Sequence, residues 1–175
     1  MTAITFSAYG DSLTASPASS WIATASDGTQ CEHVGGFARG GYRSYQVAAG
    51  VTPCTADVTV VMVGTNDVSS PRWRVPLLDT LHAIRDIIVN SGASRALVVA
   101  MPPRNDGYHA EADQLNTDIR NYAIGMGWMW VDPWTTMRTS DGKFRAGWST
   151  DGIHPNTLGA SRAGHWLRYM IQAAK

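Results

Sequence analysis

Short apolar runs alternate along the chain with segments in which apolar residues recur at helical spacing. The runs at 4–8, 57–63, 95–101 and 128–131 are almost continuously hydrophobic, and a weaker run lies at 33–37. Continuous hydrophobicity is typical of parallel strands that are buried on both faces. Strands of this kind need crossover helices between them, so the pattern predicts an α/β fold with a parallel sheet of about five strands.

The segments between and after these runs predict the helices. Apolar residues recur every three or four positions over 77–88, 112–123 and 163–171. The first of these segments stops at Gly92, because glycine commonly ends a helix. In the third segment the same spacing assigns Trp166 to the buried face.

Four stretches show neither the strand nor the helix period, and they lie at 14–30, 68–76, 102–108 and 135–150. In an open parallel sheet, ligands bind beyond the carboxyl ends of the strands. Most of these stretches leave strands at that edge. They are therefore the predicted walls of a substrate cleft.

The first apolar run ends in Gly-Asp-Ser-Leu at 10–13. A serine in a tight turn after a strand, here Ser12, can present its hydroxyl at the rim of a sheet. Far downstream, Asp151 and His154 offer a carboxylate and an imidazole, the other two members of a serine triad. Taken one at a time, these residues also fit a helix cap, a turn and a surface histidine.

Two further segments suit the binding of an oxyanion. The run at 57–63 leads into Gly-Thr-Asn-Asp at 64–67, which places the Asn66 amide at the same sheet edge as Ser12. An amide there can donate to a developing oxyanion, although the tetrapeptide is also an ordinary turn. The glycines within 35–41 either only interrupt regular structure in a loop or mark positions where the backbone approaches a substrate oxygen.

Together these segments resemble, in order and spacing, the blocks that define the SGNH hydrolases, also called GDSL esterases. The resemblance spans residues 9–156, and its second block is the loosest. That family usually has an asparagine shortly before the block-two glycine, whereas this chain reads Gly-Phe-Ala at 36–38. Taking Tyr-Arg-Ser at 42–44 as the next family positions selects Gly41 as the oxyanion glycine, with Gly40 as the alternative.

The resemblance implies a flavodoxin-like three-layer α/β/α sandwich, serine-dependent ester hydrolysis and no cofactor. It implies that Ser12 attacks the carbonyl carbon, that His154 transfers the proton and that Asp151 orients the imidazole. The backbone N–H groups of Ser12 and Gly41, with the side-chain amide of Asn66, would hold the oxyanion.

The composition of the chain limits the classes of partner that the protein is expected to bind. With 14 basic and 14 acidic residues the formal net charge is zero, so there is no excess of basic residues that would favour binding to nucleic acid.

The length of 175 residues predicts one domain over 1–175. No run of about 18 apolar residues exists and no export signal begins the chain, so we expect no membrane insertion. The protein is then cytoplasmic or virion-associated if the chain is complete, and secreted if its N-terminus was trimmed.

The two cysteines leave two interpretations open. Cys31 and Cys54 can form one disulfide or remain free thiols. Together with His33 they fit no structural zinc pattern, and we expect no metal site.

Aromatic and polar residues in the irregular stretches are candidates for substrate binding. Trp73 and Trp148 lie there and Trp134 directly precedes the stretch at 135–150, and aromatic faces suit sugars or acyl chains. Arg104 and Tyr108 lie in or directly after a Pro-rich turn that follows the fourth apolar run, and Arg104 is either a contact for an acidic substrate group or a solvated loop residue.

The expected substrate is a small-molecule or glycan ester. The short chain leaves no room for a large lid, which favours a compact acetyl or short-acyl ester. The alternatives are a carbohydrate O-deacetylase that acts on cell-envelope or polysaccharide esters, and a non-catalytic glycan-binding or virion module. Retention of Ser12, Asn66, Asp151 and His154 together favours an enzyme. Twelve arginines against two lysines indicate a GC-rich bacterial or phage genome.

Overall fold

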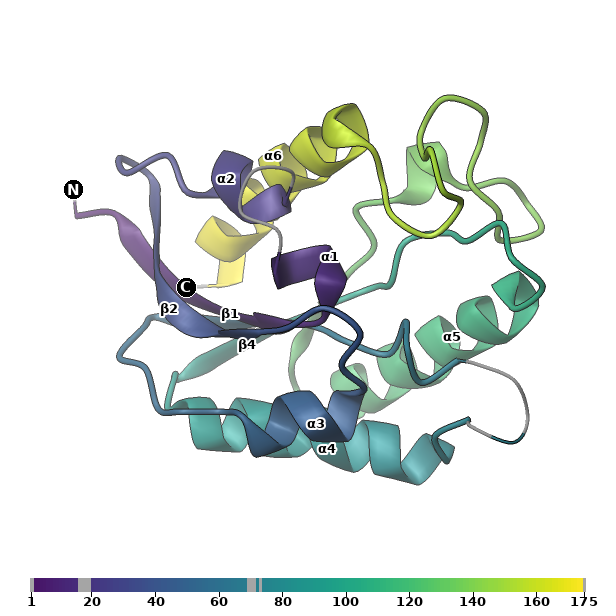
Figure 1. The fold of residues 1–175 in the computed structure, drawn as a ribbon. Coiled ribbons are helices and arrows are strands. Elements are labelled where there is room, and N and C mark those ends of the chain that lie inside the picture. Colours follow the sequence, from purple (N-terminus) through teal and green to yellow (C-terminus); the bar gives the residue numbers. More distant parts are fainter. Residues whose placement is uncertain (1, 16–19, 69–71, 73, 175) are drawn as a thin grey trace.

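The computed structural model describes residues 2–15, 20–68, 72 and 74–174. A five-stranded sheet lies between two layers of helices (Figure 1). One layer consists of α1 (Ser12–Ala15), α2 (Trp21–Ala25) and α6 (Thr157–Ala174). The other consists of α3 (Ser44–Ala49), α4 (Leu77–Ser91) and α5 (His109–Gly125). The predicted three-layer α/β/α arrangement is confirmed.

All neighbouring strands are parallel, in the order β2-β1-β3-β4-β5. The strands are β1 (Ile4–Gly10), β2 (Cys31–Ala38), β3 (Val58–Met62), β4 (Arg95–Val99) and β5 (Met129–Val131). This order is the flavodoxin-like one. The sequence signal of β2 was weak because this edge strand alternates buried or half-buried with exposed residues over most of its length.

Alternate residues of the central strands pack into two separate cores. Val60 and Leu97 belong to the cluster beneath α2 and α6, whereas Val61 and Val98 belong to the cluster beneath α4 and α5. Since side chains alternate across a strand, a sheet covered on both faces needs apolar residues at every position. This double burial explains the unbroken apolar runs.

The helices match their predicted positions, but one side chain does not. The helix α4 ends at Gly92, which has a φ of 81°, as its place in the sequence predicted. In α6, Leu167 and Ile171 fill the buried face, and Trp166 lies next to that face with 50% of its surface exposed. Tyr169 is 63% exposed on the same side of the helix. The assignment of Trp166 to the core is therefore wrong.

Both cysteines are free thiols. Cys31 is buried and its Sγ lies 3.7 Å from the carbonyl oxygen of Arg168, whereas the Cys54 Sγ lies 3.8 Å from that of Val34. The two side chains thus contact different elements, and they form no disulfide. Among the described helices, none is both long and apolar enough to cross a bilayer.

The sheet order defines where a ligand site belongs. The chain adds β2 on one side of β1 and β3 on the other. The loops that follow β1 and β3 therefore diverge at their carboxyl ends, and such a switch point leaves a crevice. Ser12 follows β1 and Asn66 follows β3, so both candidate residues lie at this switch point.

Candidate active site

The three residues of the predicted triad lie in one hydrogen-bonded chain. The Ser12 Oγ is 2.8 Å from the His154 Nε2, and the His154 Nδ1 is 2.7 Å from the Asp151 Oδ2. Ser12 and His154 are 142 positions apart in sequence, so only the fold brings them together. A hydroxyl beside a base whose second nitrogen is held by a carboxylate can act as a nucleophile in acyl transfer.

The turn before Ser12 is fixed by its neighbours. A Cβ on Gly10 would lie 2.3 Å from the Thr14 hydroxyl oxygen, so this position cannot carry a side chain without a shift. The Asp11 Oδ1 accepts a hydrogen bond of 3.0 Å from the Leu13 N–H. These constraints bend the chain sharply from β1 into α1 and hold the hydroxyl at the rim of the sheet.

The loop that carries the imidazole is held by short-range hydrogen bonds. The Asp151 Oδ1 accepts the N–H groups of Ile153 and His154, each at 2.8 Å. The Ser149 hydroxyl donates to the His154 carbonyl at 2.6 Å and accepts the Gly152 N–H at 2.8 Å. Ser149 was not predicted, although a serine two residues before an aspartate is a recognisable turn signal.

The carboxyl of Asp151 stays ionised at neutral pH. Partial burial raises its pKa, but the N–H groups of His154 and Ile153 and the His154 side chain outweigh this effect, so the pKa lies well below its usual range. The Asp151 and His154 side chains remain 52% and 44% exposed. A carboxylate held in this state favours the charged imidazolium during proton transfer.

The loop after β3 presents the Asn66 amide. The Asn66 Nδ2 donates to the Tyr42 carbonyl at 2.9 Å, which fixes the amide plane and leaves its second hydrogen available. The neighbouring Asp67 accepts the Ser44 N–H at 2.9 Å and the Thr80 hydroxyl at 2.7 Å. Asp67 therefore ties this loop to the starts of α3 and α4.

The glycine pair at 40–41 lies beside the triad. A turn is closed by the Tyr42 N–H, which donates to the Arg39 carbonyl at 3.3 Å. Within it, Gly41 has a φ of 77°, a conformation that favours glycine. A Cβ on Gly40 would lie 3.8 Å from the Ser12 Cβ, so this turn adjoins the serine. Gly41 as the oxyanion donor stays a prediction, with Gly40 as the alternative.

A second carboxyl, that of Asp11, is fully buried next to the serine. Burial and the nearby Asp67 raise its pKa to about 7, against the opposing effects of the Leu13 N–H and His154. The Asp11 Oδ2 has no hydrogen-bond partner within the described part of the chain. This side chain therefore titrates near neutral pH, even though its backbone neighbour is the candidate nucleophile.

Arg104 and Tyr108 were predicted to meet substrate, and the structure gives Arg104 another role. Arg104 is buried, and its guanidinium donates to the Thr65 carbonyl at 2.8 Å and to the Asp106 carboxylate at 2.7 Å. It therefore joins the loop after β4 to the loop that carries Asn66, which corrects both expectations for this side chain. The half-buried Tyr108 lies under it, with the guanidinium carbon 5.9 Å from the ring centroid.

The tryptophans that were candidates for substrate binding differ in their burial. Trp134 is 1% exposed and donates to the Ala100 carbonyl at 2.7 Å, so its expected place in the cleft is wrong. Trp148 is half-buried against the core, with the Arg162 guanidinium carbon 5.7 Å from its ring centroid. Trp73 lies outside the described residues.

Across the residues that the structure describes, no group of three or more His, Cys, Asp or Glu side chains is placed to hold a metal ion.

Comparison with known proteins identifies a family. The model of the GDSL-like lipase/acylhydrolase family matches residues 8–162. No curated protein matches the chain in sequence.

Several solved structures share the fold. A GDSL-like lipase from Bacteroides thetaiotaomicron superimposes with a TM-score of 0.76 at 18% identity, covering 98% of this chain and 89% of that one. The aryl esterase of Mycobacterium smegmatis gives 0.75 at 17% identity, covering 99% and 100%. A carbohydrate acetylesterase from Sinorhizobium meliloti gives 0.69 at 18% identity, covering 97% and 99%. At these identities the likeness establishes the fold.

Proposed function

The chain belongs to the GDSL-like lipase/acylhydrolase family and is a hydrolase, and we propose that it cleaves short carboxylic esters with Ser12 as its nucleophile. In this proposal His154 is the general base and acid, and Asp151 orients it. The observation that carries the proposal is the continuous chain of contacts from Ser12 Oγ through the imidazole to Asp151, at 2.8 Å and 2.7 Å.

The reaction follows from this chain of contacts. The Ser12 Oγ attacks the ester carbonyl carbon while its proton passes to the His154 Nε2. The tetrahedral intermediate then collapses, and the imidazolium gives that proton to the departing alkoxide oxygen. Water repeats the same two steps on the acyl-enzyme, which releases the acid and restores the serine. Throughout, Asp151 accepts the Nδ1–H hydrogen bond and stabilises the imidazolium.

The negative charge that develops on the carbonyl oxygen needs donors on the opposite side from the imidazole. The Asn66 amide supplies one, because only one of its hydrogens is used by the Tyr42 carbonyl. The backbone N–H groups of Ser12 and Gly41 supply the others. Each preorganised donor of this kind contributes about a hundredfold or more to turnover.

An open site supports a compact acyl group. The triad histidine and aspartate are about half exposed, so water reaches the catalytic base in the free enzyme. Such a site encloses little of a long acyl chain, whereas an acetyl or short-acyl group needs little enclosure. The proposed substrates are therefore short esters whose alcohol portion extends into solvent or along the protein surface.

A carbohydrate O-deacetylase is the second candidate. It is favoured by Trp148, a half-buried ring with Arg162 beside it, which is part of the same 147–156 loop as His154. A non-catalytic glycan module is disfavoured by the close approach of all three triad side chains, because binding alone does not require a base beside a serine hydroxyl.

Hydrolysis of p-nitrophenyl esters from acetate to octanoate tests the proposal. The wild-type protein and Ser12→Ala are compared in the presence of a chelator. We expect chelator-resistant activity that falls with acyl length and is lost by about 10⁴-fold or more in the variant. Equal rates for the two proteins would exclude Ser12 as the nucleophile for these esters.

A further inference from the structure

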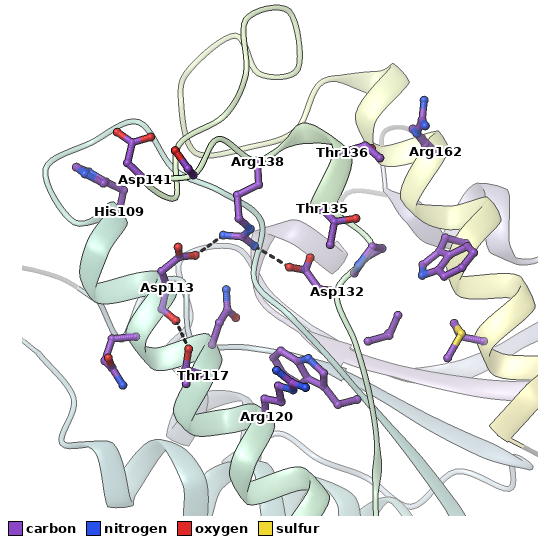
Figure 2. Close-up of a pocket in the computed structure, with 18 of the residues that line it drawn as sticks. His109, Asp113, Thr117, Arg120, Asp132, Thr135, Thr136, Arg138, Asp141 and Arg162 are labelled. Atoms are coloured by element: carbon purple, nitrogen blue, oxygen red, sulfur yellow. Dashed lines mark hydrogen bonds and ion pairs between the residues drawn. The ribbon is translucent and has the colours of Figure 1, made fainter.

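A concave surface whose lining contains none of the triad residues lies between α5 and α6, beside the edge strand β5 (Figure 2). We call it the α5–α6 groove, and its volume is about 1510 Å³. Sites for drug-sized ligands usually measure about 300–1,000 Å³. The groove is therefore larger than a compact ester needs, and its size suits an extended ligand.

A fixed set of polar groups forms the floor of the groove. The Arg138 guanidinium contacts the Asp113 carboxylate at 2.5 Å and the Asp132 carboxylate at 3.3 Å, and it donates to the Met101 carbonyl at 3.1 Å. Figure 2 shows these two ion pairs from Arg138, which joins α5 to the segment after β5. Because the Arg138 side chain is only 14% exposed, it presents its remaining polar edges in one orientation.

The α6 wall of the groove carries exposed aromatic rings. Arg162, Trp166 and Tyr169 recur at helical spacing along one side of α6, and all three are exposed. The Trp166 and Tyr169 rings are stacked, with centroids 6.0 Å apart and planes 25° apart. Two adjoining aromatic rings offer a flat apolar platform beside the charged floor.

This platform continues toward the catalytic loop. Arg162 is the last residue of the stripe and lies over the Trp148 ring, 5.7 Å from its centroid. The Trp148 carbonyl accepts the Asn156 N–H at 2.9 Å, so this ring is part of the loop that holds His154. The Arg162–Trp148 contact therefore joins the α6 side of the groove to the loop that carries His154.

We propose that the α5–α6 groove binds a polysaccharide chain whose ester substituents are presented to the triad. Sugar rings have apolar faces that cover aromatic rings, and hydroxyl groups that exchange hydrogen bonds with carboxylates, guanidinium groups and threonines. The groove offers both kinds of partner side by side. A lipid or acyl chain would strip water from the carboxylates of Asp113 and Asp141, whose side chains are 38% and 54% exposed, at a large cost in desolvation.

Protein and nucleic-acid ligands fit less well. The net charge of the chain is zero, and Asp113, Asp132 and Asp141 line the groove beside Arg120, Arg138 and Arg162, so the groove has no excess positive charge to hold a phosphate backbone. A flat protein surface would strip water from the Asp113 and Asp141 carboxylates, whereas sugar hydroxyls replace that water with hydrogen bonds. The ligand is therefore a neutral glycan, and only its presentation to Ser12 rests on the proposed function.

Binding is tested without catalysis. The Ser12→Ala protein is titrated calorimetrically with cellohexaose, xylohexaose and chitohexaose. The same titrations use a triple variant that adds Trp166→Ala and Tyr169→Ala, and a control that adds Tyr45→Ala, which removes a ring that is 48% exposed on α3. We expect at least one hexasaccharide to bind, a tenfold or greater loss in the triple variant and no loss in the control. Binding by none of the three, or equal binding by all proteins, would overturn the proposal.

Kinetics then separate this inference from the esterase proposal. In the Ser12-containing protein, the Trp166→Ala/Tyr169→Ala pair should raise KM about tenfold for the acetylated form of the hexasaccharide that binds, and leave p-nitrophenyl acetate unchanged. Hexasaccharide binding without any ester hydrolysis would refute the proposed esterase function and would still support glycan binding in the α5–α6 groove. A change of solution mass in the double variant would instead identify this face as an interface between copies and overturn the glycan site. Unaltered thermal unfolding verifies that the variants fold.

Discussion

The two halves of the proposed catalytic site are built from different kinds of structure. Ser12 and Asn66 follow central strands, and the adjacent Asp11 and Asp67 are 0% and 1% exposed. His154 is about half exposed in a loop. The sheet half is therefore positioned by the core, whereas the loop half depends on hydrogen bonds between residues close in sequence. We expect mutations in the sheet half to affect folding and catalysis together, and mutations in the loop half to affect mainly catalysis.

Contacts at the base of the loop limit how far it can move. The Asn105 N–H donates to the Gly152 carbonyl at 2.6 Å, and the Asn156 amide donates to the Gly147 carbonyl at 2.7 Å. Both bonds lie at the surface, where each contributes only about 1 kcal/mol. The loop half is thus held in place by contacts that contribute little to the stability of the sheet. This difference separates the loop half from the sheet half.

Asp151→Asn is the substitution expected to have the largest effect, and it tests whether the loop half can lose activity without losing stability. The amide cannot stabilise the imidazolium, and it favours the wrong tautomer of His154, so we expect kcat to fall by about 10⁴-fold. Because the Asp151 side chain is 52% exposed, the midpoint of thermal unfolding should barely change. Steady-state kinetics and thermal unfolding measure the two quantities. A large loss of stability would show that the loop half is part of the folding core.

In the sheet half, Asn66→Ala should lower both quantities. Loss of the amide donor should reduce kcat by about 10²-fold with little change in KM. It also leaves the Tyr42 carbonyl without its partner, which should cost about 1–2 kcal/mol in the free energy of unfolding. The matched control is Asn121→Ala, an exposed asparagine on α5. Unchanged stability of Asn66→Ala would break the expected link between folding and catalysis.

Asp11 gives the sheet half a pH dependence opposite in sign to that of Asp151 in the loop half, whose lowered pKa makes stability fall only as the pH drops below about 4. Its pKa is raised to about 7 in the folded protein, against about 3.9 in an unfolded chain. The folded state therefore holds this proton more tightly. The free energy of unfolding should fall by up to about 1.4 kcal/mol per pH unit as pH rises from 4 to 7, and the loss is complete above pH 7.

Asp11→Asn removes this slope. Denaturant unfolding at several pH values, compared with wild type, isolates the effect of Asp11 from that of His33, whose lowered pKa gives the opposite slope at acidic pH. The control is Asp79→Asn, which removes an exposed carboxylate in the first turn of α4. The slope is informative even if the variant is less stable overall. Equal slopes for Asp11→Asn and wild type would mean that Asp11 is ionised in the fold.

The sheet half could be predicted from sequence because its signals are strong and regular. Central strands that are buried on both faces read as unbroken apolar runs, and the residues directly after them must lie at the carboxyl edge of the sheet. Ser12 and Asn66 follow from this rule alone. The closeness of Asp151 and His154 to Ser12 follows from no periodicity, and it was suggested only by the order of the four sequence blocks.

Side chains in irregular segments could not be predicted in the same way. Trp134 was expected in the cleft and is buried because its indole N–H reaches the Ala100 carbonyl. Trp166 was expected in the core and is exposed because Leu167 already fills the buried face. Arg104 is buried between two loops. Each outcome depends on long-range partners, which a local pattern does not contain.

Ser149→Ala is the smallest of the tests and examines the loop half on its own. Its hydroxyl bridges the Gly152 N–H and the His154 carbonyl, so it fixes the backbone on both sides of the imidazole without touching the ring. We expect kcat to fall about threefold to tenfold, since a displacement of well under 1 Å weakens the contact between Ser12 and His154. The free energy of unfolding should fall by about 1 kcal/mol or less.

The control for this variant is Ser94→Ala, an exposed serine between α4 and β4. A positioning role for Ser149 also predicts that Ser149→Thr, which keeps the hydroxyl, restores most of the lost activity, whereas a purely structural role would restore stability alone. If Ser149→Ala matched wild type in kcat, the imidazole would be placed by Asp151 alone. The loop half would then need only the two N–H groups that Asp151 accepts, and its order would come from one carboxylate.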